Sequence, residues 1–387
     1  MAALQDRNLF FLIVDDQFSV RRMVSNFLKA GGYSRFREAA DGADAFEILN
    51  NQNIDFIVCD WNMPNLNGLE LLKKVRADES LRETPFLMVT AEVAEEVVAE
   101  AIEEGVDDYI TKPFNASTLI KKIESILARR RNPRPLDLAL REGAYKFRKG
   151  DVDDAQAHFQ RALEIAPKSP RAHLAMGEVM EAVGKEQLAL DHYQSSLNAA
   201  DRFVKAHDHL ANLYIKLEQP EKALTHLRRA AKISPRNPKR QMDLGKVLFD
   251  TGDKEKAVEA FKKAAQGAES DIALATELGE YLLAADLNEQ AAEAFQAALD
   301  RDPANVHAYN RLGMAFRRQN RYEDAVQQYR LALEVAPNDE NLYYNLALAY
   351  AEAGDIDKSL EAVKGSLKLK PDFEEAKRLY TRLVRKT

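Results

Sequence analysis

A period of 34 residues is the feature that most restricts what this chain can fold into. Residues 136–373 divide into seven consecutive blocks of 34, and no block needs an insertion or a deletion. Position 8 of every block is glycine or alanine, and positions 20 and 27 are alanine or serine. A fixed period of this length indicates stacked structural repeats, each of which buries its apolar side against its neighbours.

The spacing within each block predicts a pair of antiparallel helices. Small residues at positions 8, 20 and 27 let the two helices approach closely, and a large residue at position 24 fills the gap between neighbours. Glycine at position 15 in four blocks marks the end of the first helix, and proline at position 32 in five blocks helps to end the second. That proline is missing at Asp201 and Glu269, and Pro220 lies in the turn of block three. The pattern resembles the tetratricopeptide repeat, which implies an all-α solenoid over residues 136–373 and a closing helix within 374–387.

Residues 1–130 alternate instead between strand and helix patterns. Strands are expected at residues 9–14, 34–38, 54–60, 85–90 and 108–111, and helices at 18–30, 43–50, 68–76, 93–104 and 116–130. Five such βα units predict an α/β fold with a doubly wound, five-stranded parallel sheet. The expected strand order is 2-1-3-4-5. Residues 131–135 are expected to link this domain to the repeats.

Acidic residues stand at the ends of two neighbouring predicted strands. Asp15 and Asp16 follow the first strand, and Asp60 ends the third. Because the carboxyl ends of parallel strands meet at one edge of the sheet, Thr90 and Lys112 are expected beside them. Three converging carboxylates repel one another, and Mg²⁺ is the simplest neutraliser with oxygen ligands. Asp60 is then a nucleophile toward phosphorus, and the Lys112 ammonium and the Thr90 hydroxyl stabilise the transferred charge.

These residues, together with Tyr109 and Pro113, resemble the receiver domain of two-component response regulators, most nearly the single-domain chemotaxis type. The likeness covers about residues 8–128. It implies that Asp60 accepts the phosphoryl group as 4-aspartylphosphate. It further implies the following roles: Asp15, Asp16, Asp60 and Asn62 as Mg²⁺ ligands, Thr90 and Tyr109 as the switch pair, Asn62 and Glu92 as residues that tune autodephosphorylation, and a cis bond between Lys112 and Pro113.

The repeats are expected to bind a protein or peptide along their concave face. Positions 2, 5, 9, 12 and 13 of each first helix should line that face. The basic and amide residues at these positions include Lys205, Asn212, Lys239, Lys246, Asn310 and Arg317. Clustered cations hold carboxylates by charge-assisted hydrogen bonds, so an acidic peptide is the expected ligand.

Composition excludes several other classes of protein. The net charge of −7 argues against a nucleic-acid-binding protein, and the single cysteine excludes a disulfide framework. No apolar stretch reaches the length of a membrane span and no signal peptide is evident, so a cytoplasmic protein without membrane contact is expected. Its oligomeric state stays open, a dimer included.

The expected function is a phosphorelay response regulator that receives its phosphoryl group from a sensor histidine kinase or a phosphotransfer protein. Its only chemistry is self-phosphorylation and autodephosphorylation at Asp60, so it is not expected to be an enzyme. Three alternatives are a phosphatase that turns over at Asp60, a transcription factor, and a constitutive scaffold whose receiver is only a docking module. No catalytic set and no helix-turn-helix lies outside the repeats, which disfavours the first two.

Overall fold

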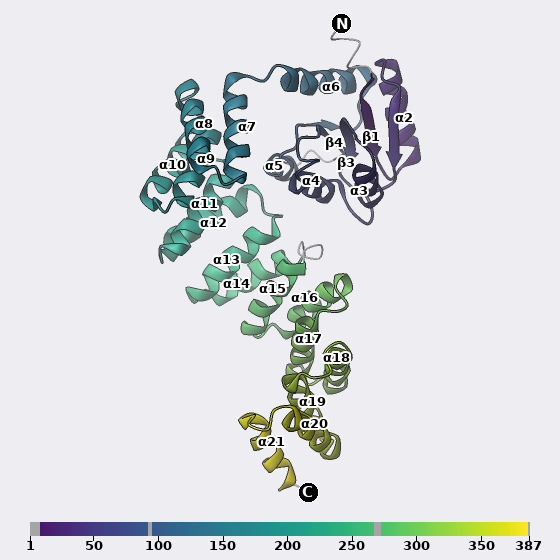
Figure 1. Ribbon diagram of the computed structural model, residues 1–387, viewed down its shortest axis with the longest axis vertical. Coiled ribbons are helices and arrows are strands. Elements are labelled where there is room, and N and C mark those ends of the chain that lie inside the picture. Colours follow the sequence, from purple (N-terminus) through teal and green to yellow (C-terminus); the bar gives the residue numbers. More distant parts are fainter. Residues whose placement is uncertain (1–7, 92–94, 267–271, 386–387) are drawn as a thin grey trace. The chain divides into compact units, whose positions relative to one another are not determined.

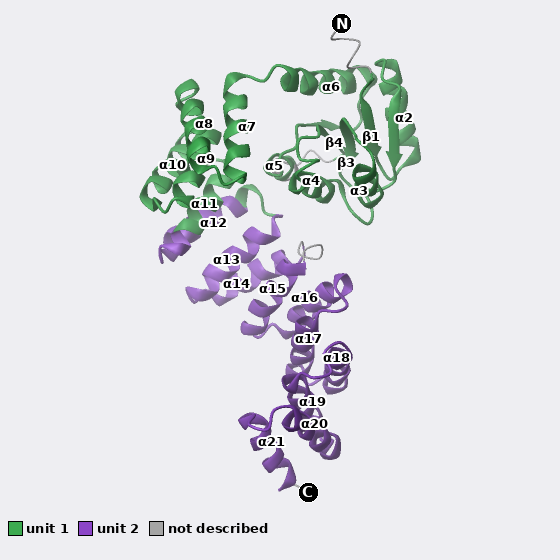
Figure 2. Ribbon diagram, viewed as in Figure 1, with its two compact units in different colours: residues 1–213, 232–235 green, residues 214–231, 236–387 purple. Residues whose placement is uncertain are grey.

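A computed structural model describes residues 8–91, 95–266 and 272–385 of the chain. It contains two compact units, residues 1–213 with 232–235 and residues 214–231 with 236–387 (Figure 2). The first unit holds a β-sheet with its helices and the first helical repeats. The second unit holds the later repeats.

The described residues form a five-stranded parallel sheet in the order β2-β1-β3-β4-β5 (Figure 1). The strands are β1 (Phe10–Val14), β2 (Arg35–Ala39), β3 (Phe56–Asp60), β4 (Phe86–Thr90) and β5 (Asp108–Thr111). The helices that accompany them are α2 (Phe18–Ala30), α3 (Gly42–Asn51), α4 (Gly68–Ala77), α5 (Glu95–Glu103) and α6 (Ala116–Arg131). The predicted fold class and strand order are confirmed.

The third strand begins two residues later than the sequence pattern predicts. Asp55 was expected inside the strand, but its carboxylate accepts the backbone N–H of Phe10 at 2.8 Å. The side chain of Asp55 thus occupies the N–H of Phe10, which would otherwise take part in the backbone hydrogen bonds between the strands. Regular pairing of the strands starts only at Phe56.

Alternate residues of each central strand pack on opposite faces of the sheet. In β1, Phe11 and Ile13 belong to a core with α2 and α6, whereas Leu12 and Val14 belong to a core with α3 and α4. Because both faces are covered, these strands are apolar throughout, as is usual for parallel sheets.

Each predicted block of 34 residues contains one pair of helices. The pairs are α7 (Pro135–Arg148) with α8 (Val152–Ile165), α9 (Pro170–Ala182) with α10 (Glu186–Ala199), α11 (Val204–Lys216) with α12 (Pro220–Ile233), α13 (Pro238–Asp250) with α14 (Lys254–Ala265), α15 (Ile272–Ala284) with α16 (Asn288–Arg301), α17 (Val306–Arg318) with α18 (Tyr322–Val335), and α19 (Glu340–Glu352) with α20 (Ile356–Leu369). A last helix, α21 (Glu374–Val384), packs on the final pair through Ala376, Leu379 and Leu383. Residues 132–134 separate α6 from α7.

The glycine at position 8 packs directly against the ring at position 24 of the same repeat. A Cβ atom added to Gly143 would lie 2.5 Å from the ring of Phe159, and one added to Gly177 would lie 2.4 Å from the ring of Tyr193. Both rings are buried. The large residue therefore fills space inside its own repeat, where the sequence pattern predicted a gap between neighbours.

The turn between the two helices of each repeat places position 15 in the left-handed region. Four repeats have glycine there, and three have a residue with a side chain. These are Gly150, Gly184, Gly252 and Gly354, with φ between 72° and 88°, and Glu218, Asp286 and Asn320, with φ between 56° and 61°. The predicted role of the four glycines is confirmed, and the same turn forms without glycine in the other three repeats.

Helix α14 ends earlier than every other second helix of the repeats. It stops at Ala265, position 28 of its block, whereas its counterparts end at position 30. Gln266 already forms a turn. This is one of the two blocks that lack proline at position 32, so the helix ends without that signal.

Candidate functional site

The register of β1 and β3 places two predicted site residues side by side. Val14 pairs with Cys59, so the residues that follow them, Asp15 and Asp60, lie next to each other at the carboxyl end of the sheet. Both are nearly inaccessible to solvent, with exposures of 3% and 6%. A buried carboxylate needs a partner, because burial without compensation strongly disfavours its charge.

The partner is the ammonium group of Lys112. Its Nζ atom lies 2.8 Å from Asp15 Oδ2 and 2.6 Å from Asp60 Oδ1. Burial raises the pKa of Asp60, and the nearby ammonium opposes this rise without cancelling it. Burial would lower the pKa of Lys112, but the hydrogen bonds and charges of the two carboxylates outweigh it and raise that pKa. The charge of each of these three side chains therefore depends on the other two.

Backbone amides hold the remaining oxygens of both carboxylates. The N–H of Gln17 donates to Asp15 Oδ1 at 2.9 Å, and the N–H of Asn62 donates to Asp60 Oδ2 at 3.0 Å. The side chains of Asp16 and Asn62 are exposed beside them. Two buried carboxylates, one exposed carboxylate and one ammonium therefore leave a formal charge of −2 at this edge of the sheet.

The fourth and fifth strands supply the predicted switch pair, Thr90 and Tyr109. Thr90 ends β4 with an exposure of 2%, and its carbonyl accepts the backbone N–H of Lys112 at 2.8 Å. Tyr109 is half-buried in β5, against the core that includes Leu71 and Phe86. The peptide bond between Lys112 and Pro113 is cis, as the resemblance implied. Glu92, predicted to tune autodephosphorylation, lies outside the described residues.

The loop between β3 and α4 fits closely beneath Asp60. A Cβ atom at Gly68 would lie 2.1 Å from the carbonyl oxygen of Asp60, so only glycine allows this approach. Asn67 and Glu70 form a reciprocal capping box at the start of α4. Sequence reasoning missed Gly68 as a site residue. The Asn-x-x-Glu pattern around it was the available signal, because it fixes where the helix begins.

A second contact holds the same loop against the start of α3. Asn65, with φ of 62°, donates from its side-chain amide to Asp41 at 2.6 Å. Asp41 caps α3 by accepting the backbone amides of Ala43 and Asp44. These long-range partners could not be found from spacing, because Asp41 and Asn65 are 24 residues apart.

Among residues 8–91, 95–266 and 272–385, no three histidine, cysteine, aspartate or glutamate side chains are gathered closely enough to hold a metal ion. At the predicted Mg²⁺ site the Lys112 ammonium lies between Asp15 and Asp60 and takes an oxygen of each. The donor chemistry still suits a hard cation, since every predicted ligand atom is an oxygen.

The residues predicted for a ligand groove have mixed surroundings. In the first unit, Lys205 and Asn212 are exposed. In the second unit, Lys246 pairs with Asp243 and Glu277. Lys239 lies 3.6 Å from Asp243, Arg317 lies 2.9 Å from Glu352, and Asn310 accepts the side-chain amide of Asn345 at 2.8 Å. The three cations of the second unit therefore have acidic neighbours within the chain, which weakens their pull on an acidic peptide.

Comparisons with known proteins match two different families to two different parts of the chain. A response regulator receiver domain model matches residues 11–124. Tetratricopeptide repeat models match residues 140–205, 209–272 and 276–340, and also residues 316–383. Within the part of the chain that the structure describes, no helix has the length and apolar character that crossing a bilayer requires.

The relatives are chemotaxis proteins that align with the first third of the chain. Chemotaxis protein CheY-3 of Vibrio cholerae is 46% identical over 129 residues, which are 33% of this chain and 99% of that protein. Chemotaxis protein CheY of Pseudomonas aeruginosa is 48% identical over 118 residues, 30% of this chain and 95% of that protein. The solved structure of CheY4 of Vibrio cholerae is 37% identical, covers 31% of this chain and 98% of its own, and superposes with a TM-score of 0.30. The chain therefore belongs to the response regulators, with a receiver domain similar to CheY followed by tetratricopeptide repeats.

Proposed function

We propose that this response regulator works in a phosphorelay and accepts a phosphoryl group on Asp60 from a sensor histidine kinase or a phosphotransfer protein. The observation that supports this most is the Lys112 ammonium between Asp15 and Asp60. An oxygen of Asp60 forms the new bond to phosphorus while the bond between phosphorus and the donor's imidazole nitrogen breaks. The electron pair of that bond stays on the imidazole. The Lys112 ammonium and the Thr90 hydroxyl stabilise the charge that develops on the phosphoryl oxygens.

The same edge of the sheet would hold Mg²⁺. The carboxylates of Asp15, Asp16 and Asp60 and the backbone carbonyl of Asn62 would be its ligands. The formal charge of −2 at this edge is what a divalent cation neutralises. When bound, the ion supplies positive charge to the phosphoryl oxygens. The residues of the chain meanwhile keep the nucleophile buried and oriented.

The repeats would be the output of the switch. We assign residues 1–130 to the receiver domain, 131–135 to a linker, 136–373 to seven repeats and 374–387 to a closing segment. The added charge at Asp60 would bias the Thr90 and Tyr109 pair between two arrangements, and the repeats would bind a protein partner in the cytoplasm accordingly. A constitutive scaffold differs in one measurable respect: its affinity for the partner does not change on phosphorylation.

Intact mass measurement tests the assignment of the acceptor. The protein is incubated with a small acyl phosphate and Mg²⁺, and the mass of one phosphoryl group should appear. Asp60→Asn should remain unlabelled, whereas Asp55→Asn, the other aspartate of that segment, should be labelled as the parent is. Label that persists in Asp60→Asn, or that forms equally well with a chelator present, would contradict the proposal.

A further inference from the structure

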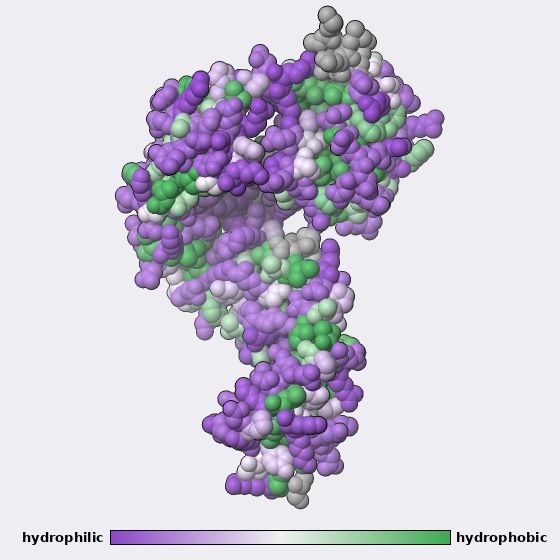
Figure 3. Space-filling view, viewed as in Figure 1, coloured by the Kyte–Doolittle hydropathy of each residue, from purple (hydrophilic) through white to green (hydrophobic). Residues whose placement is uncertain are grey.

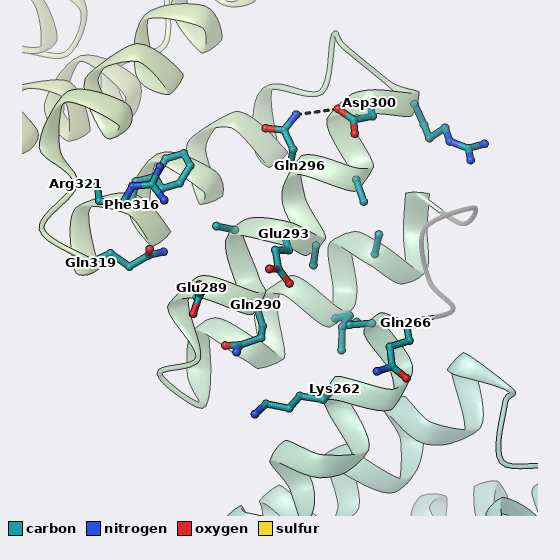
Figure 4. Close-up of a pocket in the computed structure, with 17 residues that line it drawn as sticks. Lys262, Gln266, Glu289, Gln290, Glu293, Gln296, Asp300, Phe316, Gln319 and Arg321 are labelled. Carbon is teal, nitrogen blue, oxygen red and sulfur yellow. Dashed lines mark hydrogen bonds between the residues drawn. The ribbon is translucent and has the colours of Figure 1, made fainter.

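A hollow of about 890 Å³ along α16 in the second unit has a lining that selects no ligand by charge (Figure 4). The lining holds three carboxylates and three cations, namely Glu289, Glu293, Asp300, Lys262, Arg301 and Arg321. Figure 3 shows hydrophobic residues in separate areas among hydrophilic ones on the face that it presents. A more specific arrangement lies in the receiver domain, where one arginine is bonded to the loop that carries two of the proposed Mg²⁺ ligands.

The loop between β1 and α2 carries Asp15 and Asp16 past the end of the sheet. Regular pairing of β1 with both of its neighbouring strands ends at Val14. The carbonyl groups of Asp15 and Asp16 therefore have no neighbouring strand from which to accept a hydrogen bond. Because a backbone carbonyl shielded from water needs a donor, another group of the chain has to supply one.

The guanidinium of Arg21 donates to both carbonyl groups. Its Nη1 atom lies 2.7 Å from the carbonyl oxygen of Asp15 and 3.2 Å from that of Asp16. Arg21 is the fourth residue of α2, and side chains on a helix lean toward its N-terminus, so this one reaches back over the loop. One planar group thus bridges two successive peptide groups.

The side chain of Arg21 is itself held by its neighbours. Its Nε atom lies 3.4 Å from Oε2 of Glu38 in β2, and its guanidinium carbon lies 5.6 Å from the centre of the Phe18 ring. Only 14% of the side chain is exposed. A guanidinium is a rigid fork of donors, so one that is fixed on two sides presents its remaining N–H groups in a set direction. Arg21 therefore ties the loop to both β2 and α2.

These two bonds matter most for the orientation of Asp16. The carbonyl of Asp15 belongs to the peptide group before Asp16, and the carbonyl of Asp16 belongs to the peptide group after it. Holding both groups sets the direction in which the Asp16 side chain leaves the backbone. In the part of the chain that the structure describes, no hydrogen bond or ion pair holds the exposed Asp16 carboxylate itself. The Asp15 carboxylate, in contrast, is held directly by Lys112 and by the N–H of Gln17.

We propose that Arg21 is a positioning residue, which holds the backbone on both sides of Asp16 so that its carboxylate points to where Mg²⁺ binds. This inference rests on the proposed function, because it takes Asp16 as a ligand of the ion. Groups that orient metal ligands from behind typically contribute about ten- to a hundredfold to metal affinity. Charge alone predicts the opposite sign, since a cation close to the site repels Mg²⁺. Removing Arg21 therefore separates the two effects.

Mn²⁺ is the probe, because it takes the same oxygen ligands as Mg²⁺ and its free concentration can be followed by electron paramagnetic resonance. The full-length chain is titrated, and the binding that is lost in Asp60→Asn is assigned to this site. We expect Arg21→Gln to raise the dissociation constant about tenfold. The matched control is Arg22→Gln, which removes the same charge from the next residue, where the side chain is exposed. It should leave the constant within about twofold of the parent, because solvent and salt screen an exposed charge.

A second pair of variants keeps the charge and changes only the shape of the donor. Lysine lacks the planar fork, so Arg21→Lys should weaken Mn²⁺ binding, though less than Arg21→Gln, whereas Arg22→Lys should not. This pair also decides the matter where Arg21→Gln does not fold. Unfolding midpoints in a chelating buffer show how far each variant is destabilised without any metal ion.

The outcomes distinguish this inference from the proposed function. A parent that binds Mn²⁺ and is labelled at Asp60, together with Arg21 variants that bind the ion as tightly as the parent, would overturn the positioning role alone. A lower unfolding midpoint with an unchanged dissociation constant would do the same, because it would show a purely structural role. Equal losses at Arg21 and Arg22 would also overturn it. A parent that binds no Mn²⁺ at this edge of the sheet would overturn the proposed Mg²⁺ site and the role of Arg21 together.

Discussion

The Lys112 ammonium gives two buried carboxylates a counter-charge from within the chain. Transferring a carboxylate from water into the protein interior is unfavourable, and two carboxylates side by side also repel each other. A single ammonium that contacts Asp15 and Asp60 reduces both penalties, and two backbone amides complete the set. The proposed nucleophile, Asp60, is therefore held in place by groups of the chain itself.

Neutralising Asp60 should stabilise the folded protein when no metal ion is present. Its pKa is raised in the folded state, first by burial, so folding favours the protonated form. The stability from this group is complete below its ordinary pKa of 3.8 and is lost as the pH rises through the higher folded value. In a chelating buffer at pH 7, Asp60→Asn should thus unfold at a higher temperature than the parent. The difference between the two unfolding temperatures should become smaller as the pH falls toward 4. Circular dichroism would follow both transitions.

Asp41 is the matched control, because its pKa shifts the other way. Hydrogen bonds from the backbone amide of Asp44 and from Asn65 lower that pKa, so ionisation of Asp41 stabilises the fold. Asp41→Asn should lower the midpoint temperature of unfolding at pH 7. This effect should disappear as the pH falls. If Asp60→Asn and Asp41→Asn shift the midpoint in the same direction at pH 7, the electrostatic account of Asp60 is wrong.

At the level of elements, the turns inside the repeats offer a direct test of backbone strain. Glu218, Asp286 and Asn320 adopt the left-handed conformation that four other repeats give to glycine. This conformation costs a residue with a Cβ atom about 1 kcal/mol. Glu218→Gly should therefore raise the free energy of unfolding by roughly 0.5–1 kcal/mol, measured by urea denaturation.

The reverse change at an equivalent turn is the control. Gly150 has φ of 83° with no atom near its missing Cβ, so Gly150→Ala adds strain without a clash. It should lower the free energy of unfolding by about 1 kcal/mol. Stabilisation by Gly150→Ala, or destabilisation by Glu218→Gly, would contradict this account. It would show that something other than backbone conformation decides which residue is favourable at position 15.

The packing of position 8 against position 24 predicts a coupled pair of substitutions. Gly143→Ala places a methyl group 2.5 Å from the Phe159 ring, which should cost about 1–3 kcal/mol of unfolding free energy. Adding Phe159→Leu should recover part of that loss, because a smaller side chain makes room for the methyl group. Denaturation of the single and double variants gives the coupling energy. Additive effects would contradict a direct contact.

At the scale of the whole molecule, Mg²⁺ should stabilise one part of the chain and leave the rest unchanged. A repeat array gains its stability from contacts between neighbouring repeats, so it need not unfold together with the receiver. An ion at a hundredfold excess over its dissociation constant adds about 2.7 kcal/mol to the domain that binds it. We expect calorimetry to show more than one unfolding transition. Mg²⁺ should raise the midpoint temperature of only one of them. The shift should disappear in Asp60→Asn, and a shift of every transition would indicate tight coupling between receiver and repeats.

Much of this architecture was predictable because it is periodic. The 34-residue period fixed the helix pairs, and apolar runs ending in Asp15, Asp60 and Thr90 fixed the sheet edge where the site lies. Contacts between distant loops were not predictable, such as that of Asp41 with Asn65, because spacing carries no information about them. The early end of α14 was only hinted at by the missing proline at Glu269, since an absent signal does not say where a helix stops.

The contact between positions 8 and 24 also accounts for how the seven repeats differ from one another at these positions. Wherever position 8 is glycine, position 24 is phenylalanine or tyrosine. In the two repeats where position 8 has become alanine, position 24 is aliphatic: Ala211 occurs with Leu227, and Ala347 occurs with Val363. A methyl group gained on one helix is matched by a ring lost on the other. The two positions therefore vary together among the seven repeats, and the larger residue at position 8 occurs only with a smaller one at position 24.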